Sequence, residues 1–444
     1  MKSKRSLIQI CLLGAMLLPA FTSGAQPVTQ IAAGEICSMF LKSGGSLWAM
    51  GNNELGTLGD GTYNQTNLPE QIVATNVTAI SGGGDYNLLL KNDGSLWGMG
   101  DTAFGGLGDG ASVQFTNLPM LIVASNVVAT SAGASHSLFL KDDSSLWALG
   151  WNQYGQLGDG SYDNTNVAEE VVSNGVAAIA AGGAHSLFLK NDGSLWAMGY
   201  NVSGQLGDGT YISTNRPELI VSNNVTTIAH GIFNHSLFLK SDGSLWAMGD
   251  NGSGQLGDGT YMNTNRPELI VSSNVTAIAA GYQHSLFLKN NGSLWAMGAN
   301  ENGQLGDGTW NNTNRPELIV SSNVVAVTAG VWHSLFLKND GSLWAMGNNY
   351  SGQLGDGTFN NTNRPEQILA AYNQITGQPL NSGNMQLSFV GIAGTNYALD
   401  RSFSLASPNW LPQVTNPANS FGALVFTNPP NPATNNFWRI RSVP

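Results

Sequence analysis

Apolar and polar residues alternate in a pattern that repeats about every fifty residues between Val28 and Leu369. A Trp in a Ser-Leu-Trp triplet or its close equivalent marks each copy. The copies are 49 or 50 residues apart, at Trp48, Trp97, Trp147, Trp196, Trp246, Trp295 and Trp344. A period of this length with strand-type composition is typical of propeller blades. Seven copies therefore predict seven blades.

Each repeat predicts a four-stranded antiparallel sheet, and the fifth copy shows why. Val225–Ala229 is a short β-branched strand ending in small residues, which suits a crowded position near a propeller axis. His235–Lys240 and Ser244–Gly249 read as two strands joined by a tight turn at Asp242-Gly243. Arg266–Val271 contains a Pro that cannot donate a ladder hydrogen bond, so it is expected at the outer edge.

Both faces of the central hairpin are apolar. Because side chains alternate along a strand, Leu237 and Leu239 share one face while Phe238 lies on the other. On the next strand Trp246 and Met248 share a face in the same way. A sheet with two apolar faces must be covered on both sides, and a blade wedged between two neighbouring blades meets that requirement.

The repeat ends after Leu369, and the remaining residues do not follow its pattern of apolar and polar positions. Met385–Val390, Gly422–Phe426 and Phe437–Ile440 are candidate strands there. The fold class predicted is all-β, a seven-bladed β-propeller with four-stranded blades plus a small C-terminal β-sandwich-like module. The expected division is a propeller over residues 26–372 and the module over residues 373–444. The alternative for the last part is a linker with isolated strands.

Residues 1–25 read as a secretory signal peptide. Lys2, Lys4 and Arg5 precede the apolar run Leu7–Phe21, and cleavage is expected after Ala25. An uncleaved anchor would need about 20 apolar residues, and this run is shorter. The sequence therefore predicts a secreted, periplasmic or cell-surface protein with no membrane span in the mature chain.

Composition narrows the classes of partner. The chain has 56 Gly, only 10% charged residues and a formal net charge of −11. An acidic surface repels phosphate backbones, so no nucleic-acid partner is expected. Cys11 would leave with the signal peptide, and Cys37 would then have no disulfide partner within the mature chain.

The consensus G-x-x-H-S-L-F-L-K-x-D-G-S-L-W-A-M-G-x-N-x-x-G-Q-L-G-D-G resembles the repeat of the regulator of chromosome condensation family. The resemblance spans about Val28 to Leu369 and implies a disc-shaped seven-bladed propeller. Family functions include nucleotide exchange on small GTPases, ultraviolet reception and, in a secreted bacterial member, inhibition of β-lactamases. The photoreceptor motif G-W-x-H is not reproduced, and only Gly330–His333 comes near it. The resemblance leaves open an inhibitor of a secreted or periplasmic hydrolase.

No catalytic residues, metal site or cofactor are predicted. A His recurs eleven residues before the Trp, and it is expected to bond a neighbouring backbone carbonyl and not to bind a metal. Its copies are His136, His185, His235, His284 and His333.

An Asp before Gly is expected to cap a turn, and not to bind calcium. Its copies are Asp60, Asp109, Asp159, Asp208, Asp258, Asp307 and Asp356. The match to G-x-G-x-x-G at residues 252–257 lacks the helix of a dinucleotide site.

A site for one partner should lie where the repeats differ, and aromatic residues at loop tips are common interface anchors. The predicted partner-binding residues are Trp151, Tyr200, Phe233, Tyr282, Trp332 and Tyr350. A further aromatic residue, present in every copy, is expected to pack inside its own blade. Its copies are Tyr63, Phe115, Tyr162, Tyr211, Tyr261, Trp310 and Phe359.

The function predicted is a secreted, non-catalytic scaffold that binds an extracytoplasmic protein through loops on one propeller face. One alternative is a carbohydrate-binding surface protein, because the loops combine Asn, Thr and aromatic residues. Another is inhibition of a secreted hydrolase, and a third is a lyase or hydrolase whose site assembles only in space. The sequence does not identify the partner or the propeller face that binds it.

Overall fold

The computed structural model describes residues 26–101, 103–108, 115–369, 376–379, 385–390, 396–402, 411–417, 423–428 and 437–443. All helices and strands assigned in these ranges are β-strands, joined by turns and loops. The signal peptide predicted at residues 1–25 and the domain boundary predicted at residues 372 and 373 lie outside them and stay predictions.

Seven four-stranded sheets follow one another along the chain. Blades 1 to 3 contain β1 (Val28–Ala33), β2 (Cys37–Lys42), β3 (Leu47–Gly51), β4 (Thr66–Val73), β5 (Val77–Gly82), β6 (Tyr86–Lys91), β7 (Leu96–Asp101), β8 (Phe115–Val123), β9 (Val127–Ala132), β10 (His136–Lys141), β11 (Leu146–Gly150) and β12 (Thr165–Val172). Blades 4 and 5 contain β13 (Val176–Ala181), β14 (His185–Lys190), β15 (Leu195–Gly199), β16 (Thr214–Val221), β17 (Val225–His230), β18 (His235–Lys240), β19 (Leu245–Gly249) and β20 (Thr264–Val271). Blades 6 and 7 contain β21 (Val275–Ala280), β22 (His284–Lys289), β23 (Leu294–Gly298), β24 (Thr313–Val320), β25 (Val324–Ala329), β26 (His333–Lys338), β27 (Leu343–Gly347) and β28 (Thr362–Leu369).

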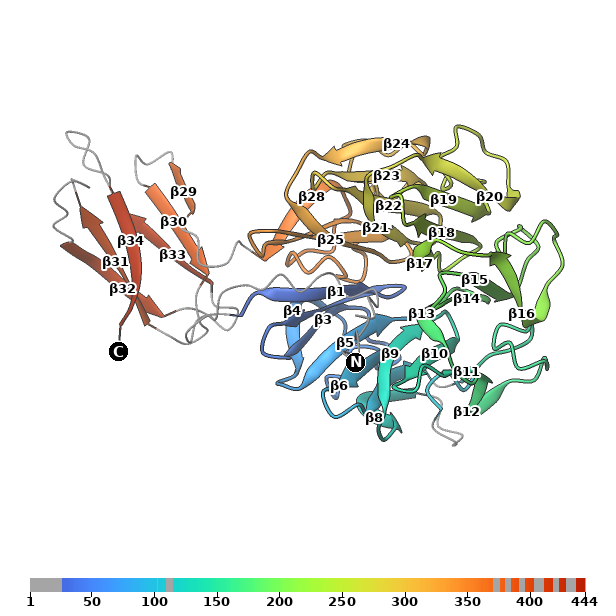
Figure 1. Cartoon of the computed structure of the whole chain (residues 1–444). Helices are drawn as coiled ribbons and strands as arrows, with labels where there is room; N and C mark the ends of the chain where they lie inside the picture. Colours follow the sequence, from blue (N-terminus) through green and yellow to red (C-terminus); the bar gives the residue numbers. More distant parts are fainter. Residues whose placement is uncertain are drawn as a thin grey trace, which may run out of the picture. The chain divides into compact units, whose positions relative to one another are not determined.

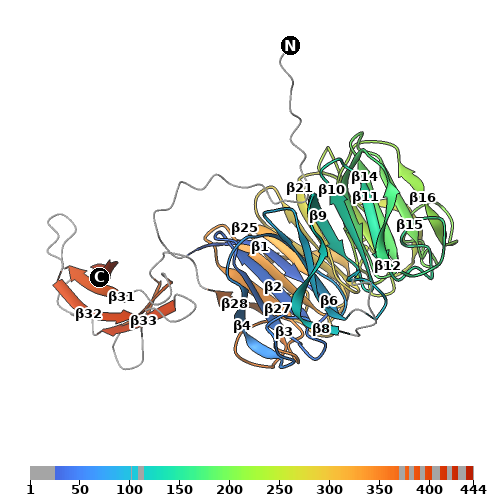
Figure 2. The same cartoon turned by 90° about the horizontal axis from the view of Figure 1, so that it is seen from below.

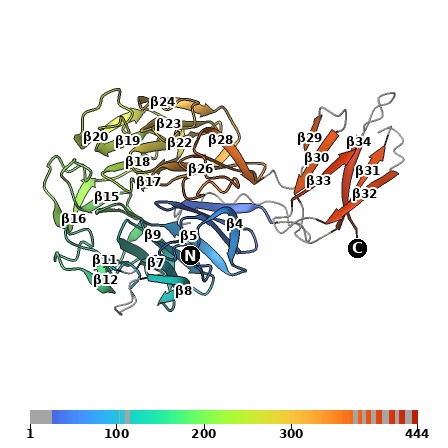
Figure 3. The ribbon, with the colours of Figure 1, turned by 180° about the vertical axis from the view of Figure 1, so that it is seen from behind.

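The strands of each blade are hydrogen-bonded in chain order, so every blade is built from one continuous segment. The first strands surround the propeller axis, and the Pro-containing strands lie at the edge, as Figures 1 and 3 show from opposite sides. The seven-bladed propeller and its strand order are therefore confirmed. No strand is shared between the first and last blades, and ring closure depends on side-chain packing and hydrogen bonds.

Each blade buries a different set of side chains on each of its faces. Leu237, Leu239 and Leu245 of blade 5 pack against residues of blade 6, including Phe287. The opposite face presents Phe238 to blade 4. Figure 2 shows sheets of neighbouring blades lying face to face. The predicted double-sided burial is confirmed, and it couples the stability of each blade to its neighbours.

The repeated Trp lies half-buried beside this core in six blades, and in blade 1 Trp48 is buried. Trp246 faces Phe238 across the hairpin, and the ring centroids are 6.1 Å apart with an interplanar angle of 6°. Its Nε1 donates to Ser244 Oγ at 2.9 Å, and Lys240 Nζ lies 4.2 Å from the indole centroid. The amphipathic Lys covers the outer surface of the indole and keeps its ammonium group near solvent.

Glycines in the connection between the third and fourth strands let neighbouring blades approach. Gly207 has a φ of 77°, which favours glycine strongly. A Cβ at this position would also collide with the sulfur of Met248 in the next blade. Both the backbone angle and the contact therefore favour Gly in the Gln-Leu-Gly turn.

The C-terminal part forms a small module of two three-stranded sheets. The first has the order β29-β30-β33 and the second the order β32-β31-β34. Their bounds are β29 (Thr376–Pro379), β30 (Met385–Val390), β31 (Asn396–Ser402), β32 (Leu411–Pro417), β33 (Ala423–Asn428) and β34 (Phe437–Val443). Leu387, Leu399 and Phe426 are buried within this module.

Gly207→Ala should lower the free energy of unfolding by about 1–3 kcal/mol, because it places a Cβ on a left-handed residue against Met248. Gly252→Ala is the matched control. Gly252 is exposed, and a Cβ there would meet only Asp250 Oδ1 at 3.8 Å. Urea unfolding curves would measure both effects. Equal midpoints for the two variants would contradict this account of the turn.

Candidate functional site

All six predicted binding residues belong to connections at the same end of the blades. In a four-stranded antiparallel blade, the connection between the first and second strands and the one between the third and fourth strands emerge on one side. We call this side the aromatic face. The Asp-Gly hairpins emerge on the opposite side. The strand order thus places Phe233, Tyr282 and Trp332 on the same face as Trp151, Tyr200 and Tyr350.

Three of these residues form an inner arc across blades 5, 6 and 7. The ring centroids of Phe233 and Tyr282 are 4.5 Å apart, and those of Tyr282 and Trp332 are 4.7 Å apart. All three side chains are half-buried. Each comes from the short connection before a second strand, so adjacent blades bring them into contact. The inner arc is a continuous aromatic surface that retains accessible area.

An outer arc runs across blades 2, 3 and 4. Phe104 lies 6.2 Å from Trp151, Trp151 lies 5.4 Å from Tyr154, and Tyr154 lies 4.4 Å from Tyr200, measured between ring centroids. The sequence prediction included Trp151 and Tyr200 but not Phe104 or Tyr154. Their aromatic character in non-equivalent loop positions was the available signal, and only the fold shows that they complete a contiguous cluster.

Tyr350 is 70% exposed and makes no ring contact within the part of the chain that the structure describes. Its backbone N–H donates to Asn348 Oδ1 at 3.2 Å, which fixes the loop but not the ring. Tyr350 therefore lies on the aromatic face as an isolated side chain, outside both arcs.

Carboxylates lie next to the end of the inner arc. The backbone N–H of Val331 donates to the carbonyl of Glu35 at 3.3 Å, which joins the blade 7 and blade 1 connections. Burial, and then the neighbouring Asp85, raise the pKa of Glu35. Burial, and then Asp101, raise the pKa of Asp85. None of the connections on this face contains Lys or Arg, although the guanidinium groups of Arg216, Arg266, Arg315 and Arg364 reach the Gly-Asp-Gly turns at its rim.

The repeated His forms a clasp between neighbouring blades. His136 Nε2 lies 2.8 Å from Ser186 Oγ of the next blade. Ser186 Oγ donates to the carbonyl of Gln156 at 2.7 Å, so it accepts its bond from the His Nε2–H. The expected structural role is right, but the expected partner was wrong. The ring bonds a side-chain hydroxyl and not a backbone carbonyl.

The same clasp occurs at four further junctions and closes the ring. It joins His185 to Ser236, His235 to Ser285, His284 to Ser334 and His333 to Ser38. At the two remaining junctions Cys37 pairs with Asn87, and the Tyr86 hydroxyl lies 2.9 Å from Ser137 Oγ. The position eleven residues before each Trp therefore joins neighbouring blades throughout the propeller.

The clasp histidines are neutral in the folded protein. Burial lowers the pKa of His136, His235 and His284 to about 3 and that of His333 to about 4. Burial also lowers the pKa of His185 well below its usual range. With the proton on Nε2, Nδ1 has no donor to accept from.

The repeated Asp caps a turn, as predicted. Asp258 Oδ1 accepts from the N–H of Thr260 at 2.8 Å and from Asn251 Nδ2 at 3.0 Å. Equivalent bonds form around Asp60, Asp159, Asp208, Asp307 and Asp356. Asp109 lies outside the described residues. Within the described ranges, no three His, Cys, Asp or Glu side chains gather into a metal-binding group.

A model of the RCC1-like domain family matches residues 16–271 and 173–399. The chain belongs to this family. A search of curated proteins found no match. Human WBSCR16 aligns over 76% of the chain and 96% of its own length, with 23% identity and a TM-score of 0.66. Yeast RCC1 (Prp20), solved bound to Kap60, aligns over 80% of the chain and 86% of its own length, with 21% identity and a TM-score of 0.66. A second structure, of Prp20p from Saccharomyces cerevisiae, carries a title that reports binding to Gsp1p and histones. This structure aligns over 80% of the chain and 89% of its own length, with 22% identity and a TM-score of 0.66.

In this RCC1-like chain the aromatic residue present in every repeat is exposed, so the prediction that it packs inside its own blade was wrong. Exposed fractions run from 39% for Phe115 to 53% for Tyr162. Six of the rings lie two residues after the Gly-Asp-Gly turn at the rim of the propeller, and Phe115 is the first residue of β8. We call Tyr63, Phe115, Tyr162, Tyr211, Tyr261, Trp310 and Phe359 the rim aromatic residues.

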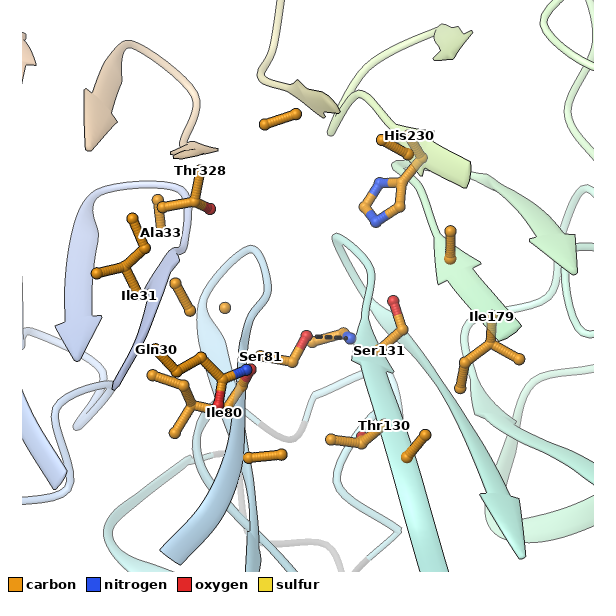
Figure 4. A pocket seen from close by; sticks show the side chains of 18 of the residues that line it. Gln30, Ile31, Ala33, Ile80, Ser81, Thr130, Ser131, Ile179, His230 and Thr328 are labelled. Atoms are coloured by element: carbon orange, nitrogen blue, oxygen red, sulfur yellow. Dashed lines mark hydrogen bonds between the residues drawn. The ribbon is translucent and has the colours of Figure 1, made fainter. Parts of the chain in front are cut away.

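The propeller axis holds a channel of about 420 Å³, lined by first-strand residues from all seven blades. Most of the side chains are small, as the sequence predicted for these strands. His230 of β17 is larger and points into the channel in Figure 4. Burial lowers its pKa to about 4.

Within the described residues no helix is long and apolar enough to cross a membrane.

The clasp histidines make the RCC1-like propeller sensitive to acid. A His whose pKa is about 3–4 when folded and about 6.5 when unfolded binds fewer protons in the folded state. The free energy of unfolding should therefore be highest above pH 6.5 and fall steadily as the pH drops towards 4. Each His contributes a slope of up to about 1.4 kcal/mol per pH unit. The pH range in which the His residues change stability lies above the range in which Asp residues with a lowered pKa do so, because the pKa of those Asp residues is below 3.8.

Urea unfolding at pH 7.5, 6 and 5 would measure the slope. The variant His185→Gln removes one titrating ring, so its stability should depend on pH less steeply than that of the unchanged chain. A stability that is flat between pH 7 and pH 5 would show that the buried rings do not carry this linkage.

Proposed function

We propose that the chain is a secreted, non-catalytic scaffold that binds a protein partner on its aromatic face. The observation that carries the proposal is the convergence of two contiguous aromatic arcs on the face where the repeats differ. Aromatic side chains that are partly accessible and mutually packed supply large contact area at low entropic cost. The similarity to yeast RCC1 (Prp20), whose structure holds Kap60, supports a protein as the kind of partner.

The charges favour a basic segment on the partner. Glu35 of blade 1 and Asp85 of blade 2 follow the blade 7 end of the inner arc, and the connections on this face lack Lys and Arg. A Lys or Arg side chain can lie over an aromatic ring while it approaches a carboxylate. Binding should then weaken as salt rises, because opposite charges are screened.

The double variant Tyr282→Ala and Trp332→Ala should lose the partner. Removal of two packed aromatic anchors costs about 2 kcal/mol or more each, so affinity should fall at least 100-fold. The measurement is a pull-down from an extracellular or envelope extract, with bound proteins identified by mass spectrometry and titrated as purified components. The melting temperature should change little, because the rings lie outside the cores between blades.

Leu318→Ala is the matched control for this variant. Leu318 is 50% exposed on the outer strand β24, far from the connections of the aromatic face. This variant should capture the partner as well as the unchanged chain does. If the double variant also keeps its partner at unchanged affinity, the inner arc is not the binding site.

Export is part of the same proposal, and it rests on the basic and apolar pattern of residues 1–25. The protein expressed in a Gram-negative bacterium should be found outside the cytoplasm with Gln26 as its first residue. N-terminal sequencing of the fractionated protein measures this. A cytoplasmic protein that begins at Met1 would contradict export.

A further inference from the structure

The rim aromatic residues need an explanation outside the core. Every repeat carries one, and all seven are 39–53% exposed. A half-exposed ring contributes much less to folding than the fully buried Phe of the second strand, which is 0–1% exposed in six of the blades. Polar residues would fit this turn at least as well. The aromatic residue at each rim position is therefore available for binding.

The groove between blades 3 and 4 shows what surrounds such a ring. A cavity of about 280 Å³ is lined by Tyr162 of blade 3 and by residues of blade 4, including Asp208, Thr210, Asn215 and Glu218. One wall is aromatic, and most of the others carry hydrogen-bonding groups. The volume lies just below the range of about 300–1,000 Å³ for small-molecule sites, which suits one ring-sized unit of a ligand.

The polar wall of this groove is held in place before any ligand arrives. Asp208 Oδ1 accepts from Asn201 Nδ2 at 3.0 Å, and Asp208 Oδ2 accepts from Thr210 Oγ1 at 2.7 Å. Burial and the neighbouring Asp208 raise the pKa of Glu218, so the two carboxyl groups lie close together. The same pairing relates Glu169 to Asp159 and Glu366 to Asp356. Fixed acceptors beside an aromatic wall reduce the entropic cost of binding.

This combination matches the chemistry of a sugar ring. The C–H groups on one side of a pyranose pack on an aromatic face, and its hydroxyl groups donate to carboxylates and exchange hydrogen bonds with Thr and Asn. Paired carboxyl groups disfavour an anionic ligand. We propose that the grooves between neighbouring blades at the rim bind separate units of one neutral polysaccharide chain.

The repetition of the groove favours a polysaccharide over a protein. At five junctions one blade carries an aromatic residue at the position of Tyr162 and the next blade carries Glu at the position of Glu218. These Glu residues are Glu70, Glu218, Glu268, Glu317 and Glu366. A protein offers one copy of an epitope, whereas a polysaccharide offers the same unit many times. Several weak sites can then bind one chain together with high avidity.

The junction between blades 1 and 2 differs from the others. Met120 occupies the Glu position of blade 2, and Tyr63 packs edge-on against Phe115 at 5.7 Å between ring centroids. This junction lacks the carboxyl pair and its ring already has an aromatic partner. It is therefore an internal negative control for the five junctions that carry both the aromatic residue and the Glu.

The test uses the full chain and a printed array of neutral polysaccharides, including glucans, xylans, mannans and galactans, with alginate and pectate as acidic probes. We expect retention on at least one neutral polysaccharide and none on the acidic probes. The quadruple variant Tyr162→Ala, Tyr211→Ala, Tyr261→Ala and Trp310→Ala should lose at least 100-fold in apparent affinity. Its melting temperature should be unchanged within a few degrees, because these rings are exposed.

Two control variants make the outcome specific. Tyr63→Ala should retain the polysaccharide as well as the unchanged chain, because its junction lacks the Glu. The double variant Tyr282→Ala and Trp332→Ala should also retain it, because it removes the inner arc and leaves the rim intact. Failure of the protein-binding proposal is thus distinguishable from failure of this one. Absence of retention on every neutral polysaccharide, or unchanged retention by the quadruple variant, would overturn the inference.

Discussion

Burial of both faces of every blade against its two neighbours is the interaction on which the rest of the structure depends. A blade of this chain presents Leu side chains on one side and Phe and Met side chains on the other, and neither side faces water in the closed ring. Because every blade is one continuous segment, no exchanged strand holds the first and last blades together. The contact between His333 and Ser38 is equivalent to the clasps elsewhere, so the ring closes by the same contacts that join its other blades.

This arrangement divides the repeat into parts that packing fixes and parts that it leaves free. The hairpin and its paired Phe and Trp, the clasp position and the Gly-Gln-Leu-Gly turn all contact another blade or stabilise one. Neighbouring connections on the aromatic face are joined by backbone bonds, such as that from Val331 to Glu35, and by the ring contacts of the two arcs. Side chains there can differ from blade to blade at little cost to stability, and this is where the two aromatic arcs and the acidic residues occur.

Much of the fold could be predicted from the sequence because the same pattern of apolar, Gly and Pro residues occurs in seven copies of about fifty residues. The Asp-Gly hairpin, the outer position of the Pro-containing strand and the two apolar faces all follow from local rules, and the structure has each of them. The two kinds of variable connection share one side because the first and third strands of a blade run in the same direction, and this face was not identified from the sequence. The partner of the clasp His was not deducible, because Ser186 lies fifty residues from His136 and belongs to the next copy.

The site was harder to predict than the fold. Contacts within the arcs join residues of different repeats, so Phe104 and Tyr154 became evident only when the blades were placed side by side. The rim aromatic residues were misjudged because recurrence within a chain suggests a core role. Recurrence shows that a position is under the same constraint in each blade, and exposure is needed to say which constraint it is.

The central claim is that no blade is stable without both of its neighbours. Urea unfolding followed by hydrogen exchange and mass spectrometry, with peptides from the hairpins of blades 1, 4 and 7, tests this most directly. The account predicts that all three peptides lose protection at one common urea concentration. Separate midpoints, with one blade still protected after its neighbour has opened, would contradict it.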